Sequence, residues 1–399
     1  MDNSFSLDIL LAASGISQKT RARLWSTMTA KTKEPIPRVI TSNARSALRA
    51  QPRANPFTLK ILAQLNETLT PLAASGALRK SIAEPAEVSL YKWVVDVITV
   101  AVTDGMMGKV CLDRFPETVD AVFLLIMNVY TVFQRRPRMF ARQTYDTTDK
   151  LTQLLDKYFS LPREKRMDCV EFVAKVEDDI RSADLSQEEL SKIILDNPAI
   201  LAFWFLSHIL WRPGLFSVIR AECEQAFTEN SPLAPSDISE RLGCCPTLKA
   251  TFQETARLNC GLHLFRQVYE DTEVGRYRLR KGSRLMIAYS RVHVDKSHWG
   301  PDADEFNYRR FLDNPGLASS KHFKPFGDGT HQCGAKLMVP QLLMYFVAIV
   351  VCRYDFRIAG GFESYPFPKI DESKGRATVP MPVVDDVPRV SITPRKSAV

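Results

Sequence analysis

Phe326-Gly-Asp-Gly-Thr-His-Gln-Cys333-Gly-Ala-Lys336 is the stretch that decides the fold of this 399-residue chain. It is a glycine-rich loop with a single cysteine, and a strongly apolar segment from Leu337 to Cys352 follows it. Glycines allow the backbone to fold closely around a sulfur atom and to point N–H groups at it. The apolar segment predicts a buried helix, whose positive N-terminal end favours a thiolate. The pattern suits a metal-bound thiolate, and an inert buried cysteine in a turn is the alternative.

Two segments upstream of the loop carry charged residues in recognisable patterns. Glu254-Thr-Ala-Arg257 lies in a stretch, 248–258, that is predicted to be a helix. Residues three apart share one face of a helix, so the two side chains are expected to pair. A solvated ion pair is the ordinary interpretation of such a pattern. Further along, the segment from Trp299 to Phe311 is rich in turn-forming residues and contains Arg310.

Together these three segments resemble the motifs of the cytochrome P450 family. The loop is similar to the haem-binding signature F-x-x-G-x-[RH]-x-C-x-G, which Phe326, Gly329, His331 and Cys333 match in order and spacing. Ala335 stands where the signature ends in glycine. The resemblance implies haem b as the cofactor, with Cys333 as the axial thiolate ligand of the iron and the other three matching residues around it.

The resemblance also implies roles for residues outside the loop. Glu254 and Arg257 correspond to the family's helical Glu–Arg pair, and Arg310 to the third member that locks the segment behind the haem. Arg266 lies in a strand-like stretch and resembles an arginine that contacts a haem propionate, although an exposed strand arginine is equally compatible. His293 matches a recurrent family position and is expected to be structural.

The candidate catalytic residues, Asp196 and Asn197, come from Leu195-Asp-Asn-Pro-Ala-Ile-Leu-Ala-Phe203-Trp204. Most family members carry an acid–threonine pair in this helix, but no threonine follows the acid here. Asn197 with the later Phe-Trp pair resembles the branch that contains sterol 7-alpha-hydroxylases, prostacyclin synthase and fungal relatives. Pro198 either loosens the helix, which brings the Asn197 amide near the oxygen site, or marks an ordinary helix start.

The order of apolar patterns predicts the fold class. Residues 1–250 have mostly helical periodicity, and 264–289 has strand-like alternation with glycines at the turns. We therefore expect one domain over residues 1–399, mainly α with a small β portion. The resemblance implies the cytochrome P450 fold, shortened at its N-terminus, without the membrane-anchor helix and the first sheet strands that relatives carry.

Composition excludes several other classes. The net charge of +8 is spread without a long Lys/Arg block, which argues against nucleic-acid binding. Eight scattered cysteines suggest a reducing compartment, and neither they nor the six histidines have the spacing of a structural zinc site. No apolar run reaches the roughly 20 residues that a spanning helix needs. We therefore expect a cytoplasmic-side chain without a transmembrane segment, although full-length relatives are anchored in the endoplasmic reticulum.

The function implied by the resemblance is a haem-dependent monooxygenase that oxidises a lipophilic small molecule, sterol-like or from fungal secondary metabolism. Electrons are expected from NADPH-cytochrome P450 reductase, docked near Lys321, Lys324 and Lys336, and the chain is expected to be a monomer. Two alternatives stay open: an isomerase or dehydratase of the prostacyclin-synthase kind, and a truncated, non-catalytic relic. NADPH-dependent turnover separates the first from the monooxygenase, and haem content separates the relic from both.

Overall fold

The computed structural model describes ten continuous stretches of the chain and a few single residues near the N-terminus. The stretches are 55–70, 76–85, 87–133, 137–182, 198–227, 237–261, 263–268, 270–329, 332–374 and 379–395, and the single positions are 22, 26, 35, 39, 42–43 and 46–48. In these residues helices predominate and strands are few, which confirms the predicted fold class.

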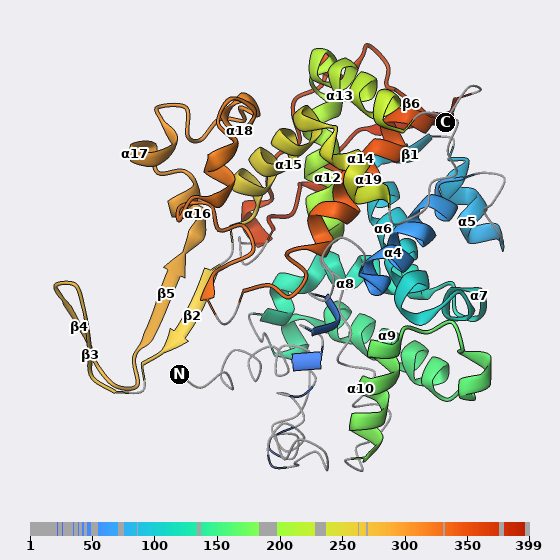
Figure 1. Ribbon diagram of the computed structural model, residues 1–399. Helices are drawn as coiled ribbons and strands as arrows, with labels where there is room; N and C mark the ends of the chain where they lie inside the picture. The colour runs from blue at the N-terminus through green and yellow to red at the C-terminus, as the bar shows by residue number, and fades with distance from the viewer. Residues whose placement is uncertain are drawn as a thin grey trace.

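The helices and strands follow the expected order along the chain (Figure 1). The helices are α4 (Pro56–Thr68), α5 (Gly76–Ala83), α6 (Leu90–Met107), α7 (Val110–Arg114), α8 (Thr118–Phe133), α9 (Arg142–Phe159), α10 (Glu171–Ser182), α12 (Pro198–Leu210), α13 (Pro213–Ala226), α14 (Ile238–Gly243), α15 (Pro246–Asn259), α16 (Tyr289–His293), α17 (Lys296–Trp299), α18 (Arg309–Asp313) and α19 (Met338–Arg353). The strands are β1 (Glu87–Ser89), β2 (His263–Gln267), β3 (Thr272–Val274), β4 (Tyr277–Leu279), β5 (Arg284–Ala288), β6 (Tyr354–Arg357) and β7 (Arg389–Pro394).

Helix α12 is the central element of the core. Every residue from Ala199 to Leu210 is buried, and α6, α13, α15 and α19 all pack against this helix. The indole N–H of Trp204 donates to the Pro380 carbonyl over 2.7 Å, so even the polar edge of this large side chain has a partner. A helix that is apolar on all sides is stable in water only when neighbours cover it completely.

Helices α4 and α6 cross at close range because a glycine lies at the contact. A Cβ added to Gly105 would lie 2.6 Å from a side-chain carbon of Ile61. Both helices have defined starts: the Asn55 side chain accepts from the Thr58 N–H over 3.0 Å, and Ser89 caps α6. Both helices lie in the part of the chain for which the periodicity predicts helices, and the three-residue strand β1 directly precedes α6.

The small β portion consists of three antiparallel pieces. Strands β1, β7 and β6 form one sheet in that order, β2 pairs with β5, and β3 pairs with β4. Figure 1 shows the β3–β4 hairpin extending away from the helices. The strand-like alternation in 264–289 thus corresponds to two pairs, which place the segment after α15 against the segment before α16.

Among the described residues, no single helix is long and apolar enough to cross a membrane. Helices α12 and α13 meet the length and composition together, but they are bent by 108° at the break between them. The apolar segment after the cysteine loop forms α19, which is largely buried in the main core. The structure thus shows a core helix there, as the sequence predicts.

The helix that contains the candidate catalytic segment is described only from Pro198 onward, because 183–197 lies outside the described residues. It ends at Leu210, and a new helix begins at Pro213, where proline occupies the first helical position. The two interpretations of Pro198, a loosened helix and a helix start, are therefore both still compatible with the structure.

Candidate haem-thiolate site

The cysteine loop is closed by its own backbone. The Cys333 N–H donates to the Phe326 carbonyl over 2.9 Å, and the Gly327 N–H donates to the Lys324 carbonyl over 3.0 Å. Gly327 and Gly329 have φ angles of 74° and 68°, a region that favours glycine. The glycines of the loop are therefore needed for its turns, and the loop holds Cys333 at an exposed position.

The sequence predicts that the apolar helix begins close to the cysteine. In the structure the loop does not lead directly into this helix. Helix α19 begins at Met338, and a turn over 334–337 separates it from Cys333. The Val339 N–H already donates to the Ala335 carbonyl over 2.9 Å, so helical pairing starts inside this turn. The expected effect of the helix dipole on the thiolate is therefore smaller, because such an effect falls off within the first turn.

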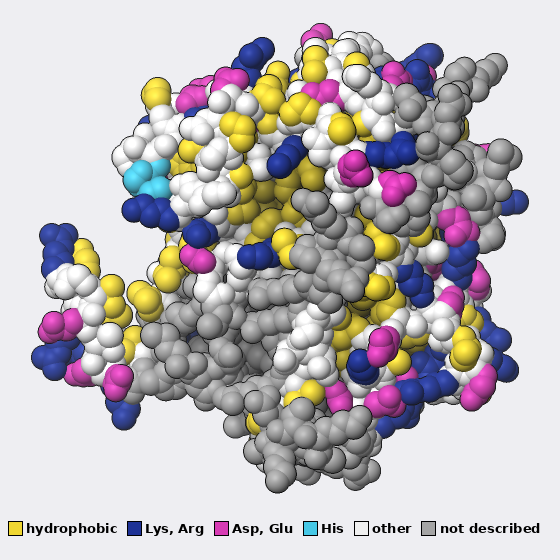
Figure 2. Space-filling view, viewed as in Figure 1, with side chains coloured by type: hydrophobic (Ala, Val, Ile, Leu, Met, Phe, Trp, Pro, Cys, Tyr) yellow, Lys and Arg dark blue, Asp and Glu magenta, His cyan; other side chains and the backbone are white. Residues whose placement is uncertain are grey.

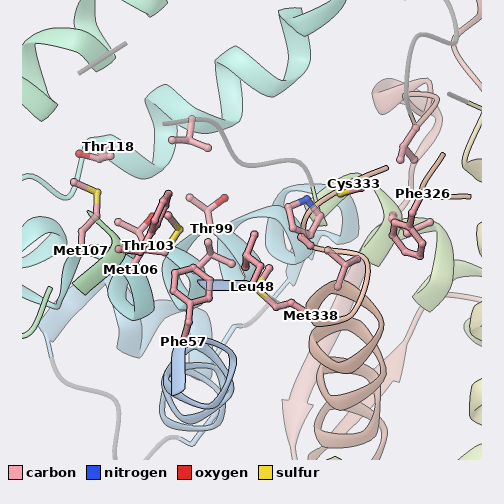
Figure 3. A pocket seen from close by; sticks show the side chains of 18 of the residues that line it. Leu48, Phe57, Thr99, Thr103, Met106, Met107, Thr118, Phe326, Cys333 and Met338 are labelled. Atoms are coloured by element: carbon pink, nitrogen blue, oxygen red, sulfur yellow. The ribbon is translucent and has the colours of Figure 1, made fainter. Parts of the chain in front are cut away.

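Cys333 lies at the wall of an apolar cavity of about 410 Å³ (Figure 3). That volume is within the range of ligand pockets in proteins. Neither a charged side chain nor a histidine is among the described residues that line it. The lining comprises Leu48, Phe57, Thr99, Val102, Thr103, Met106, Met107, Thr118, Val122, Leu151, Leu155, Phe172, Pro198, Leu201, Cys260, Pro325, Phe326, Cys333, Ala335, Met338, Val339 and Val379.

A second cysteine, Cys260, lies in the same cavity wall. Burial, and then the nearby Cys333, raise the pKa of the Cys260 thiol to about 12. Cys260 is thus held as a neutral thiol at physiological pH, whereas Cys333 is exposed. The structure therefore distinguishes one exposed candidate ligand from one buried, protonated neighbour.

Glu254 and Arg257 form a buried ion pair, with both side chains 0% exposed. Arg257 donates from Nε to Glu254 Oε2 over 2.8 Å and from Nη2 to Oε1 over 2.7 Å. Its remaining donors contact the carbonyls of His293, Ala303 and Glu305. The ordinary interpretation of the pattern, a solvated pair, does not apply, because the guanidinium holds together segments 36 to 48 residues away.

Arg310 reaches the same cluster from α18. Its Nε lies 3.5 Å from Glu254 Oε1, and its Nη2 lies 2.9 Å from Asp302 Oδ2. It also donates to the backbone carbonyls of Trp299 and Asp302. The structure therefore brings Glu254, Arg257 and Arg310 together, which we refer to as the charged lock.

His293 connects the charged lock to the segment that leads into the cysteine loop. Its Nε2 accepts from the Lys324 N–H over 3.0 Å, and its carbonyl accepts from Arg257. Burial, and then the Arg257 charge, lower the pKa of His293 to about 4. The histidine is therefore a neutral hydrogen-bond acceptor that positions the chain just upstream of Phe326.

Several predicted site residues are not placed by the structure. Asp196, Asn197 and His331 lie outside the described residues. For Arg266 only the backbone is described: it lies in β2, opposite Leu285 of β5. The assignments of these four side chains stay predictions.

Sequence reasoning missed the threonines in the cavity wall. Thr99 and Thr103 lie one turn apart on α6, and Thr118 begins α8. The i, i+4 spacing of two hydroxyl residues in a mostly apolar stretch, 97–103, was the available signal. It was not informative by itself, because threonines in helices commonly bond to their own backbone.

The cavity and the loop fit a haem. A haem iron held by a cysteine needs one thiolate at the wall of an apolar space, with a close backbone around the sulfur. Cys333, the backbone bond to Phe326 and the apolar lining meet this description. At Gly329 an added Cβ would meet no atom of the described residues within 4 Å. Fold and site together therefore fit a helical haem-thiolate protein.

A family model described as cytochrome P450 matches residues 8–363. The chain therefore belongs to the cytochrome P450 family, for which haem is the expected cofactor.

The named relatives have low sequence identity to this chain and are longer than it. Cytochrome P450 monooxygenase poxD of Penicillium oxalicum is 25% identical over 324 residues, covering 76% of this chain and 64% of that protein. Cytochrome P450 monooxygenase nodJ of Hypoxylon pulicicidum is 27% identical, covering 71% and 60%. Carnosic acid synthase of Rosmarinus officinalis is 28% identical, covering 42% and 33%. The chain thus spans less than two thirds of the length of these relatives.

Proposed function

We propose that this chain acts as a haem-dependent monooxygenase on a lipophilic small molecule, with Cys333 as the axial ligand. The observation that carries the proposal is the position of Cys333, exposed at the wall of a cavity whose described lining is uncharged. The names of the fungal relatives in Penicillium oxalicum and Hypoxylon pulicicidum support the same class of reaction.

The residues of the site have separable tasks in this proposal. Cys333 binds the iron as a thiolate, and the backbone of its loop holds the sulfur in place. When bound, haem supplies the activation of dioxygen and the transfer of one oxygen atom to a C–H bond. The apolar wall excludes water and holds the hydrocarbon part of the substrate. His331 and Arg266 are proposed to hold the propionates, and Asp196 and Asn197 to position a proton near the oxygen site.

The electron donor is proposed to be NADPH-cytochrome P450 reductase, docked beside the cysteine loop. Lys321 is exposed there. Lys324 lies 3.1 Å from the Asp328 carboxylate, and Lys336 lies 2.5 Å from the Gln332 amide oxygen. A basic patch of this kind attracts an acidic partner surface. The resemblance further supports a sterol-like or secondary-metabolite substrate and a place beside the endoplasmic-reticulum membrane.

The proposal is tested by the reduced carbon-monoxide difference spectrum of the full chain. We expect a thiolate-type Soret shift in the wild type and its loss in Cys333→Ala. Cys260→Ala is the matched control: it removes the neighbouring buried thiol and should retain the shift. Loss of the shift in Cys260→Ala with retention in Cys333→Ala would reverse the assignment, and no haem in any form would favour the relic.

A second measurement on the same proteins does not depend on the spectrum. Cys333 and Cys244 are both exposed thiols, and only Cys333 lines the cavity. Haem should therefore protect Cys333, but not Cys244, from alkylation by iodoacetamide, as read by peptide mass spectrometry. Oxidised product that requires both reductase and NADPH would then separate the monooxygenase from an isomerase.

A further inference from the structure

The hydroxyls of Thr99 and Thr118 are buried without a hydrogen-bond partner among the described residues. Thr99 is 0% exposed and Thr118 is 2% exposed. Both residues line the cavity that Cys333 also lines, and they come from different helices, α6 and α8. A buried hydroxyl without a partner is unfavourable, since it has lost its bonds to water and gained none.

Several other helical threonines among the described residues have a backbone partner. Thr68, Thr147 and Thr255 each donate to the carbonyl four residues earlier, over 2.8 Å. This local bond is the usual way in which a helix satisfies a threonine hydroxyl. Ser207 and Thr251 also carry unpartnered buried hydroxyls, but neither lines the cavity. Thr99 and Thr118 therefore combine two properties: an unsatisfied hydroxyl and a position in the wall of the cavity.

Three threonines supply the hydroxyls of the described cavity wall, and we refer to this part of the wall as the hydroxyl end. Figure 3 shows Thr99 between Cys333 and Thr103, with Thr118 on the opposite side of the view from Cys333. Thr103 follows Thr99 by one turn, lies on the same face of α6 and is half-buried. Met106 and Met107 lie beside Thr103 and Thr118 in the same view, so the hydroxyls stand in an otherwise apolar part of the wall.

The charge of the wall limits what can bind at the hydroxyl end. Lys, Arg, His, Asp and Glu are all absent from the described residues that line the cavity. A carboxylate or an ammonium group would therefore lose its hydration without finding a counter-charge, which is strongly unfavourable. A neutral oxygen, in an alcohol or a ketone, needs only the hydrogen bond that a threonine hydroxyl can give or accept.

We propose that Thr99 and Thr118, with Thr103 one turn further along α6, bind a neutral hydroxyl or carbonyl oxygen of an otherwise hydrocarbon substrate. This inference rests on the proposed function, because it names the substrate class of the same cavity. The oxygen held by the threonines fixes the orientation of the molecule, so that its hydrocarbon part extends toward the haem that Cys333 would hold. The substrate is then a hydrocarbon that already carries a neutral oxygen.

The test compares three probes of one shape: decalin, 2-decalol and decalin-2-carboxylate. Their affinities for the full chain are measured by isothermal titration calorimetry, which does not require turnover. We expect the wild type to bind 2-decalol about tenfold more tightly than decalin, the value of one good hydrogen bond, and the carboxylate most weakly. Thr99→Val and Thr118→Val should each reduce the preference for the alcohol, and the double variant should abolish it, with decalin binding unchanged.

Thr147→Val is the matched control, because it deletes a buried helical hydroxyl that already has a backbone partner and does not line the cavity. It should leave the preference for the alcohol unchanged. The proposal is overturned if the wild type shows no preference, if the preference survives in the double variant, or if Thr147→Val reduces it equally.

The outcomes for this inference and for the proposed function are distinguishable. If the chain prefers the alcohol through its threonines but has no thiolate-type spectrum, the inference is supported and the proposed monooxygenase function is contradicted. If the chain has a thiolate-type spectrum and a reductase-dependent product, but the double variant still prefers the alcohol, only the inference about the threonines is contradicted.

Discussion

Around Glu254 and Arg257 the chain buries two charges and pairs them, whereas around Cys333 it exposes a thiol at the wall of an apolar cavity. In the charged lock, backbone carbonyls from three other positions take up the remaining donors of Arg257. In the cavity, two hydroxyls have no partner among the described residues. A polar network that is satisfied internally fixes a geometry, while a wall with unmet capacity binds a ligand.

The two regions are connected, which explains why one chain needs both. The His293 carbonyl accepts a hydrogen bond from Arg257, and its Nε2 accepts one from the backbone N–H of Lys324, two residues before Phe326. The lock thus sets the position of the segment that enters the cysteine loop. The comparison can be tested by changing residues of the charged lock and of the cavity wall separately and measuring the unfolding free energy or the haem content of each variant.

The largest effect is expected from Arg257→Ala. This change leaves the Glu254 carboxylate buried without its main partner, and such losses cost about 3–5 kcal/mol of unfolding free energy. Urea denaturation followed by circular dichroism measures the difference. Arg278→Ala is the control: the Arg278 side chain is 72% exposed beside Asp271, and its loss should leave the unfolding free energy unchanged. Equal stability of the two variants would contradict the lock.

If Arg257→Ala does not fold, Arg257→Lys gives the same test in a milder form. Lysine retains the charge but cannot bind the carboxylate through two parallel bonds and three carbonyls at once. We expect a stability between that of the wild type and that of the alanine variant.

A smaller effect is expected from the pH dependence of His293. Its pKa is about 4 in the folded chain against 6.5 ordinarily, so the unfolded chain binds more protons between these values. Its contribution is therefore complete above pH 6.5 and is lost as the pH falls toward 4, roughly 3 kcal/mol in all. His293→Gln should remove this component, so that its stability falls less steeply than that of the wild type over the same window. Parallel curves would show that His293 does not stay neutral in the fold.

The smallest effect on stability is expected on the cavity side, from Ala335→Gly. Ala335 lies in the turn before α19 and lines the cavity, so removing its Cβ opens the space beside Cys333. The change should cost no more than about 1 kcal/mol through backbone entropy. Haem content after expression should rise, because the variant matches the family signature at its last position. Unfolding free energy and haem per chain are the two readouts, and a fall in both would show that Ala335 is required by the loop.

Features that depend on neighbours along the chain could be predicted from the sequence. The glycines around Cys333 predicted the loop, the apolar run predicted α19, and the alternation in 264–289 predicted the paired strands. The spacing of Glu254 and Arg257 gave their contact, since residues three apart in a helix must share a face. These features follow local rules. The order of the three motifs along the chain also indicated the family.

Features that depend on residues distant in the sequence are set by the tertiary fold. It made the Glu254–Arg257 pair fully buried, because carbonyls up to 48 residues away close over it. It brought threonines of α6 and α8 into one wall with Cys333, more than 200 positions later in the sequence. Periodicity shows which face of a helix is apolar, but burial and unmet hydrogen bonds depend on which segments pack against that face. The cavity is therefore a property of the packing, and the cysteine that defines its chemistry is a property of the sequence.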